Sequence, residues 1–268
     1  MSMFHIRLRA LTLIPILLGF FCLCTVIPGY AEWYVAGYGG VGMGQNLTDV
    51  TMPPYGERLA QAQFPTTTIP TTGDTLTQSF NTSDISLNSS PIFGAKVGYF
   101  LEDPSFKWLG FELETFTSKP DIKQQTLHTS QDILYTPKNT AGCPLILDQC
   151  PQSINGQPGQ FAVSESSLRV TAVAANLIAR YPGKLLQPYL GIGVGAFYFN
   201  ASDQFSGSQF VPGLNTQAGL KILATEEWGL FVEGKYNYAT IDNLDPSGYG
   251  LSGTYSAFNL LGGVAYHF

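Results

Sequence analysis

The last thirteen residues, Ser256-Ala257-Phe258-Asn259-Leu260-Leu261-Gly262-Gly263-Val264-Ala265-Tyr266-His267-Phe268, carry the pattern that decides the fold. Large apolar residues occupy alternate positions, and residues such as Asn259, Ala265 and His267 lie between them. Because successive side chains of a β-strand point to opposite faces, this spacing predicts a strand with one apolar face that ends on Phe268. Such a strand is typical of a barrel wall that faces lipid.

The overall composition favours the same environment. Only 12% of the 268 residues are charged, whereas soluble domains carry about 25%. Beyond the N-terminal segment, no stretch contains the run of roughly 18 apolar residues that a membrane helix requires. Transmembrane β-strands reconcile these two facts, because their apolar residues alternate with others and form no run.

The N-terminal segment has the features of a secretory signal peptide. Two arginines precede an apolar stretch from Ala10 to Ile27, and Gly29 and Ala31 supply the small residues for a cut after Ala31. An uncleaved anchor helix is the alternative. Pro15 interrupts the apolar stretch, and a cleavage-like tail follows it, so we favour the cleaved signal.

Removal of residues 1–31 leaves a predicted barrel domain of residues 32–268, with 11 basic and 19 acidic residues and a net charge of −8. The predicted location is the bacterial outer membrane. An acidic exterior argues against nucleic acid as a partner. Cys143 and Cys150 are the two cysteines that remain, and an even pair in an exported chain predicts a disulfide. No histidine or second cysteine pair lies near them, which argues against zinc.

The predicted fold is an all-β, eight-stranded antiparallel transmembrane barrel. The predicted strands span residues 33–42, 91–101, 107–117, 166–181, 187–200, 210–224, 228–240 and 254–268. Short links follow the second, fourth and sixth strands, whereas two links, 43–90 and 118–165, are very long. Short periplasmic turns and long extracellular loops are typical of outer-membrane barrels, although a soluble eight-stranded barrel is an alternative. The long, polar loops are predicted to be flexible surface segments.

Aromatic residues gather at both ends of the predicted strands. Trp33, Trp108 and Trp228 lie at the short-turn ends. The opposite ends carry Phe116, Tyr198, Phe210, Tyr238 and Tyr255. Two aromatic belts mark two lipid–water interfaces. Trp108 is out of phase with the lipid-facing residues that follow it, which predicts a bulge at that rim.

The other face of the strands predicts a charged interior, made by Lys96, Glu112, Glu114, Lys221, Glu233 and Lys235. A turn centred on Pro104 predicts that Lys96 lies opposite Glu112, and the third short turn places Glu233 near Lys221. Buried charges are tolerated only when they are paired. Since eight strands enclose about the volume that their own side chains fill, we interpret the charges as a polar plug, with a gated pore as the alternative. In the fourth strand, the pattern leaves open whether Arg169 or Asn176 faces inward.

A glycine motif near the start of the mature chain resembles a nucleotide-binding loop. Gly37, Gly39 and Gly42 spell G-x-G-x-x-G. A dinucleotide site needs a strand before this loop and a helix after it, but these glycines lie within the first predicted strand. They are better explained by close strand approach, so no cofactor is predicted. No His, Asp and Glu cluster has the spacing of metal ligands, so no metal site is predicted either.

A second motif, in the loop 118–165, bears on enzymatic activity. His128 and Ser130 are two residues apart, with Asp132 nearby, and this spacing resembles that of some outer-membrane lipid A deacylases. A serine nucleophile needs a base held within hydrogen-bond reach, and a Thr- and Gln-rich loop does not hold that geometry. We therefore interpret the match as accidental and predict no enzymatic activity.

Several short stretches together resemble a known family. They are Trp33-Tyr34-Val35-Ala36-Gly37, Gly110-Phe111-Glu112-Leu113-Glu114, Ala175-Asn176-Leu177, Pro188-Tyr189-Leu190-Gly191-Ile192-Gly193-Val194-Gly195, and the ending Tyr266-His267-Phe268. The chain resembles the outer-membrane β-barrels that include the opacity proteins and the membrane domain of outer-membrane protein A. The resemblance implies an assembly signal at Gly263, Tyr266 and Phe268 for the barrel-assembly machinery, with Leu261 where a polar residue is usual.

The resemblance also implies contacts with outer-membrane lipid and lipopolysaccharide. The long loops suggest an unknown surface ligand, because barrels keep recognition in their loops. The leading functional hypothesis is an integral outer-membrane protein with a structural or surface-interaction role. The alternatives are a small diffusion pore and a lipid-modifying hydrolase that uses His128 and Ser130.

Overall fold

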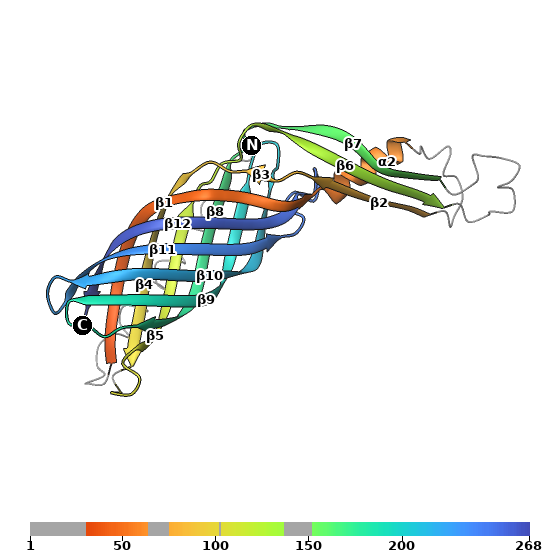
Figure 1. Cartoon of the computed structure of the whole chain (residues 1–268). Coiled ribbons are helices and arrows are strands. Elements are labelled where there is room, and N and C mark those ends of the chain that lie inside the picture. The colour runs from red at the N-terminus through yellow and green to blue at the C-terminus, as the bar shows by residue number, and fades with distance from the viewer. Residues whose placement is uncertain (1–30, 64–74, 102, 137–151) are drawn as a thin grey trace, which may run out of the picture. The chain divides into compact units, whose positions relative to one another are not determined.

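Eight antiparallel strands close into a barrel in the computed structural model, which describes residues 31–63, 75–101, 103–136 and 152–268 (Figure 1). The barrel strands are β1 (Ala31–Thr51), β4 (Ser90–Leu101), β5 (Leu109–Ser118), β8 (Leu168–Arg180), β9 (Leu186–Ala201), β10 (Gly207–Leu223), β11 (Trp228–Ile241) and β12 (Ser252–His267). Each strand pairs with its neighbour along the chain of barrel strands, and β12 pairs with β1 to complete the wall. The predicted eight-stranded architecture is confirmed.

The C-terminal strand shows why the wall forms. Phe258, Leu260 and Val264 point outward and are 46%, 45% and 44% exposed, whereas Leu261 and Ala265 are buried in the lumen. The alternation therefore separates a lipid-facing surface from an interior, as the sequence predicted. Among the described residues, no helix is long and apolar enough to cross a membrane.

The two rims of the barrel differ in the length of their connections. The short-turn rim carries the links 102–108, 181–185 and 224–227, and the long-loop rim carries the others. At the first short turn, Lys96 pairs with Glu114 rather than with Glu112, so the turn centres on Ser105 and not on Pro104. The Asp103 carboxylate accepts a hydrogen bond from the Ser105 N–H at 2.8 Å and stabilises this longer turn.

The bulge predicted at Trp108 is wrong. Trp108 precedes β5, and its indole N–H donates to the Ser105 carbonyl oxygen at 3.1 Å. The residue therefore belongs to the turn, where the alternation of a strand does not apply. The β5 pairing with β4 and with β8 runs without a register shift.

The long loops contain regular structure, which corrects the prediction that they are flexible. Their elements are α2 (Pro53–Gln63), β2 (Thr75–Thr82), β3 (Ile85–Ser86), β6 (Gln125–Thr136) and β7 (Gln152–Val163). β6 lies between β2 and β7 in an antiparallel sheet, and Thr51 of β1 pairs with Asn81 of β2 (Figure 1). The high Thr and Gln content concealed an alternation in β6, where Leu127, Ile133 and Tyr135 are buried.

Candidate functional site

The middle of the lumen holds two lysines and three glutamates. Lys96 Nζ lies 2.6 Å from Glu233 Oε2 and 3.5 Å from Glu112 Oε1. Lys235 binds Glu114 and lies 3.2 Å from Glu233 Oε1. All five side chains are almost completely shielded from solvent. Their mutual pairing offsets a desolvation cost that isolated buried charges would not tolerate.

Neutral side chains complete the hydrogen bonding of the carboxylates. Each glutamate accepts a hydrogen bond from a tyrosine hydroxyl: Glu112 from Tyr34 at 2.6 Å, Glu114 from Tyr38, and Glu233 from Tyr189 at 2.7 Å. Side-chain amides of Asn176, Asn215 and Gln217 add donors to Glu112 and Glu114. Asn176 thus faces inward and Arg169 outward, which resolves the open assignment in the fourth strand.

Lys221 lies apart from this central cluster and does not pair with Glu233, contrary to prediction. In the register of β10 and β11, Lys221 is opposite Phe231, and Glu233 is opposite Gly219. Glu233 is therefore deeper in the lumen, where it meets Lys96 and Lys235 instead. The prediction considered only strands joined by one short turn. It could not find Lys96 as the partner of Glu233, because Lys96 lies on a strand across the lumen.

A second polar cluster surrounds Lys221 near the short-turn rim. Lys221 Nζ is 3.3 Å from His267 Nε2, and His267 Nδ1 is 2.8 Å from Glu32 Oε1. Glu32 also binds the guanidinium of Arg180 through both carboxylate oxygens. Sequence reasoning missed Glu32 and Arg180. Arg180 is four residues after Asn176 and therefore lies on the same inward face of the strand, and this alternation could have identified it.

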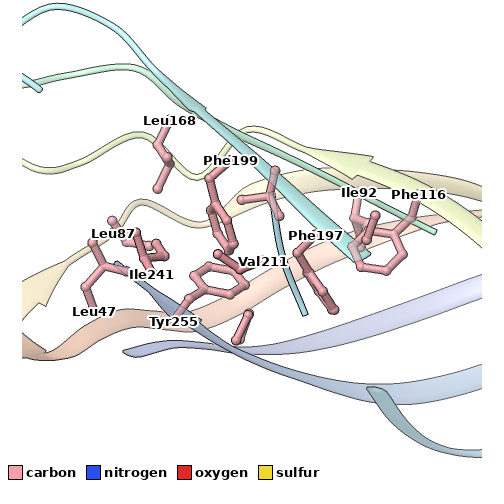
Figure 2. Close-up of a cluster of buried hydrophobic side chains, with 14 of the residues drawn as sticks. Leu47, Leu87, Ile92, Phe116, Leu168, Phe197, Phe199, Val211, Ile241 and Tyr255 are labelled. Atoms are coloured by element: carbon pink, nitrogen blue, oxygen red, sulfur yellow. The ribbon is translucent and has the colours of Figure 1, made fainter. Parts of the chain in front are cut away.

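An apolar cluster fills the lumen on the long-loop side of these charges. Phe197 and Phe199 of β9 are fully buried, and Phe197 meets Phe116 with ring centroids 6.0 Å apart. Figure 2 shows Phe199 and Tyr255 side by side, and their ring centroids are 5.2 Å apart. On the other side of the charges, the pocket bordered by Lys221 has a free volume of about 20 Å³, enough for about one water molecule.

Long-loop segments share one aromatic core. It consists of Tyr55 of α2, Phe80 of β2, Phe161 of β7, Phe205 of the β9–β10 link and Tyr249 of the β11–β12 link. The ring centroids of Tyr55, Phe161 and Tyr249 are 5.2–5.4 Å apart in pairs. We call α2, β2, β6, β7 and these two links the loop cap.

Helix α2 packs closely against the sheet of the loop cap. Ala60 is buried with Ile133 and Tyr135. A Cβ atom on Gly56 would lie 2.5 Å from the Phe80 Cβ, so glycine permits this approach. The Gln131 amide also donates to the Gly56 carbonyl oxygen at 2.9 Å. These contacts explain why loops of polar composition adopt a defined fold.

The hydrolase candidates lie on β6 rather than in a loop. His128, Ser130 and Asp132 share one strand face, on which successive side chains are about 7 Å apart. Asp132 accepts hydrogen bonds from Ser79 Oγ at 3.1 Å and from the Gly156 N–H at 2.6 Å. In the described chain, no hydrogen bond joins the side chains of His128 and Ser130, so this geometry does not activate the serine.

The remaining predicted residues fall in two groups. Cys143, Cys150 and the signal peptide apart from Ala31 lie outside the described residues, and both features stay predictions. Gly263 and Tyr266 lie on β12, and the Phe268 N–H donates to the Trp33 carbonyl oxygen at 3.0 Å. The described residues contain no group of three His, Cys, Asp or Glu side chains placed to hold a metal ion.

Wall, lumen and rims together define a closed transmembrane β-barrel with a plugged interior. Residues 58–268 match the family described as outer membrane protein beta-barrel domain. The chain belongs to this family, and its membership points to the bacterial outer membrane. Among curated proteins, none matches the sequence.

Three of the solved structures that resemble this chain are the following. Neisserial surface protein A is 12% identical, with a TM-score of 0.45, over 89% of this chain and 99% of that one. OprG from Pseudomonas aeruginosa is 14% identical, with a TM-score of 0.42, over 90% and 96%. Ail of Yersinia pestis, solved with the heparin analogue sucrose octasulfate, is 12% identical, with a TM-score of 0.38, over 89% and 99%.

Proposed function

We propose that this protein is a non-conducting, non-enzymatic outer-membrane barrel that presents its loop cap as a recognition surface outside the cell. The observation that carries the proposal is the aromatic core of the loop cap, in which Tyr55, Phe161 and Tyr249 join segments far apart in sequence. Loops that only connect strands need no such core. A rigid scaffold is what a recognition surface requires, because ordering the loops in advance lowers the entropic cost of binding.

The filled lumen supports a role other than diffusion. Phe197 and Phe199 occupy the long-loop side, and the Lys96–Glu233 pair spans the middle. A solute that passed through would have to displace both layers. We accordingly place the function on the outer surface, with the signal peptide 1–31 cleaved during export.

The exposed face of the loop-cap sheet suggests the chemistry of a ligand. Its side chains include Thr77 and Ser79 of β2, His128 and Ser130 of β6, and Gln160 of β7. Hydroxyl, amide and imidazole groups share this face with the Asp132 carboxylate and the exposed Leu134, and its described part carries no lysine or arginine. Such a surface suits a neutral, hydroxyl-rich ligand such as a glycan, bound by hydrogen bonds rather than by ion pairs.

Two measurements test the proposal. Purified, refolded protein in a planar bilayer is expected to give no stepwise current, and a reproducible conductance would contradict the non-conducting role. Protein in lipid nanodiscs is expected to bind members of a neutral glycan array. The double variant His128→Ala/Gln160→Ala should lose this binding, whereas Arg58→Gln, on α2, should retain it. Equal binding by both variants would remove the exposed sheet face from the proposal.

A further inference from the structure

Arg169 is an unusual residue on the outward wall of the barrel. Its neighbours Leu168 and Val170 are buried in the lumen, so Arg169 points away from it. Apart from Asp49 at the long-loop end of β1, it is the one charged side chain on the outward face of the eight described barrel strands. Within the described chain, its guanidinium has neither a hydrogen bond nor an ion pair. A charge on a lipid-facing wall is costly unless it lies at the interface and meets a partner there.

A second cation adjoins Arg169. Ser118, the last residue of β5, pairs with Val170, and both point inward. Lys119 follows Ser118 directly and is exposed, as Arg169 directly precedes Val170, so the two cations lie at the same level of neighbouring chain segments. The Lys119 side chain is 51% exposed, and its Nζ lies 3.6 Å from Asp121 Oδ2, an exposed pairing of little strength. On the other side, Asn200 of β9 pairs with Arg169 and extends the row of hydrogen-bond donors.

The row of outward residues immediately below marks the edge of the hydrocarbon. In register across β5, β8, β9 and β10, this row is Thr117, Thr171, Tyr198 and Phe210. The rings of Tyr198 and Phe210 have centroids 4.4 Å apart, and Phe210 is 72% exposed. Aromatic residues concentrate at the lipid–water boundary. Arg169 and Lys119 consequently lie just beyond the hydrocarbon, at the level of lipid headgroups.

A shallow, open groove lies in the outer wall beneath the ring of Phe210. It is lined by Val194, Gly195, Ala196, Phe210, Val211 and Pro212. The groove arises because small outward residues, Ala196 and Pro212, lie between a row of large residues above them and Val194 and Leu214 below. Its apolar lining and its opening toward lipid fit an acyl chain.

We propose that this face binds one phosphorylated lipid of the outer leaflet, with an acyl chain in the groove and the phosphate at Arg169 and Lys119. The planar guanidinium can donate two parallel hydrogen bonds to phosphate oxygens, and the ammonium adds a second charge. The charged side chains of the long loops are mostly acidic. Arg169 and Lys119 are therefore not part of a broad basic surface that attracts anions in general. The proposal requires that this rim of the barrel lie at a layer of lipid headgroups. It does not depend on the glycan recognition proposed above.

Native mass spectrometry of the full mature barrel in detergent micelles tests the site. The probes are lipid A and its dephosphorylated form, which has the same acyl chains. The unmodified barrel should bind lipid A about tenfold more tightly than the dephosphorylated lipid, and Arg169→Gln/Lys119→Gln should abolish that difference. Arg58→Gln, the same chemical change on α2, should preserve it. Ala196→Trp, which fills the groove, should weaken the binding of both lipids.

Three outcomes would overturn the proposal. They are equal binding of the two lipids by the unmodified barrel, unchanged selectivity in the double variant, and competition by inorganic phosphate at the concentration at which lipid A binds, which would indicate an ion site. Arg169 and Lys119 make no contact with the lumen, so the variants should keep the heat-dependent gel mobility of a closed barrel. Loss of glycan binding with intact lipid selectivity would contradict only the function proposed for the loop cap.

Discussion

Lys96 Nζ of β4 lies 2.6 Å from Glu233 Oε2 of β11, although β1 and β12 separate these strands in the wall. The ion pair therefore crosses the lumen and ties opposite sides of the barrel together. Around it, two ammonium groups face three carboxylates, so the two signs of charge are not interchangeable in this network.

Lys96→Met should destabilise the barrel more than Glu233→Gln does. Loss of Lys96 leaves three carboxylates with one lysine, at a cost of about 3–5 kcal/mol. Glu233→Gln balances two lysines against two glutamates and keeps an acceptor for Tyr189, so we expect a cost of about 1–2 kcal/mol. Urea unfolding in lipid vesicles measures both values.

The exposed Lys119 provides the control for this comparison. Lys119→Gln removes an ion pair at the surface and should cost no more than about 1 kcal/mol. Equal costs for Lys96→Met and Glu233→Gln would contradict an excess of negative charge in the network.

Gly98→Ala should destabilise the barrel although it adds only a methyl group. A Cβ atom at this position would lie 2.2 Å from the ring of Tyr34, whose hydroxyl donates to Glu112. Displacement of the ring should cost about 1–3 kcal/mol. Gly37→Ala is the matched control, because its Cβ would meet no atom within 4 Å, and its effect should stay within about 0.5 kcal/mol. Similar effects of the two substitutions in unfolding experiments would argue against the tight contact.

Phe161→Ala should loosen the loop cap and leave the barrel closed. Phe161 contacts Tyr55 and Tyr249 in the aromatic core, and removal of such a ring costs about 3–5 kcal/mol. Limited proteolysis should cut the loop cap faster, while the gel shift on heating persists. Gln160→Ala, on the opposite face of β7, should be cleaved at the rate of the unmodified protein; rapid cleavage of both variants would place the stability of the loop cap elsewhere.

Ser130→Ala should leave the lipid A profile of expressing cells unchanged, because no described side chain activates this hydroxyl. Asp132→Ala should instead reduce the stability of the loop cap by about 1–3 kcal/mol, since Asp132 accepts hydrogen bonds from Ser79 and from the Gly156 N–H. Mass spectra of extracted lipid A and proteolysis rates separate the two roles. A lipid change that Ser130→Ala abolishes would restore the hydrolase hypothesis.

The sequence alone determined the wall of this barrel and the face on which most wall residues lie. The exceptions are the fourth predicted strand, whose faces were left open, and Phe116 and Tyr255, which were assigned to an aromatic belt but are buried in the lumen. In β12, Leu260 and Val264 point to lipid and Leu261 to the lumen because the alternation of a strand is local and needs no knowledge of distant residues. The same rule separated the inward Lys96 and Glu112 from the outward Phe111.

Tertiary structure decided which inward residues meet. The first short turn is two residues longer than predicted, and this moved Lys96 from Glu112 to Glu114 in register. Closure of the wall brought Glu233 to Lys96 from across the lumen. The loop cap likewise depends on Tyr55, Phe161 and Tyr249 arriving at one place from distant parts of the chain. Partners of this kind depend on register and closure, which are properties of the whole barrel, whereas the direction of a side chain depends only on its own strand.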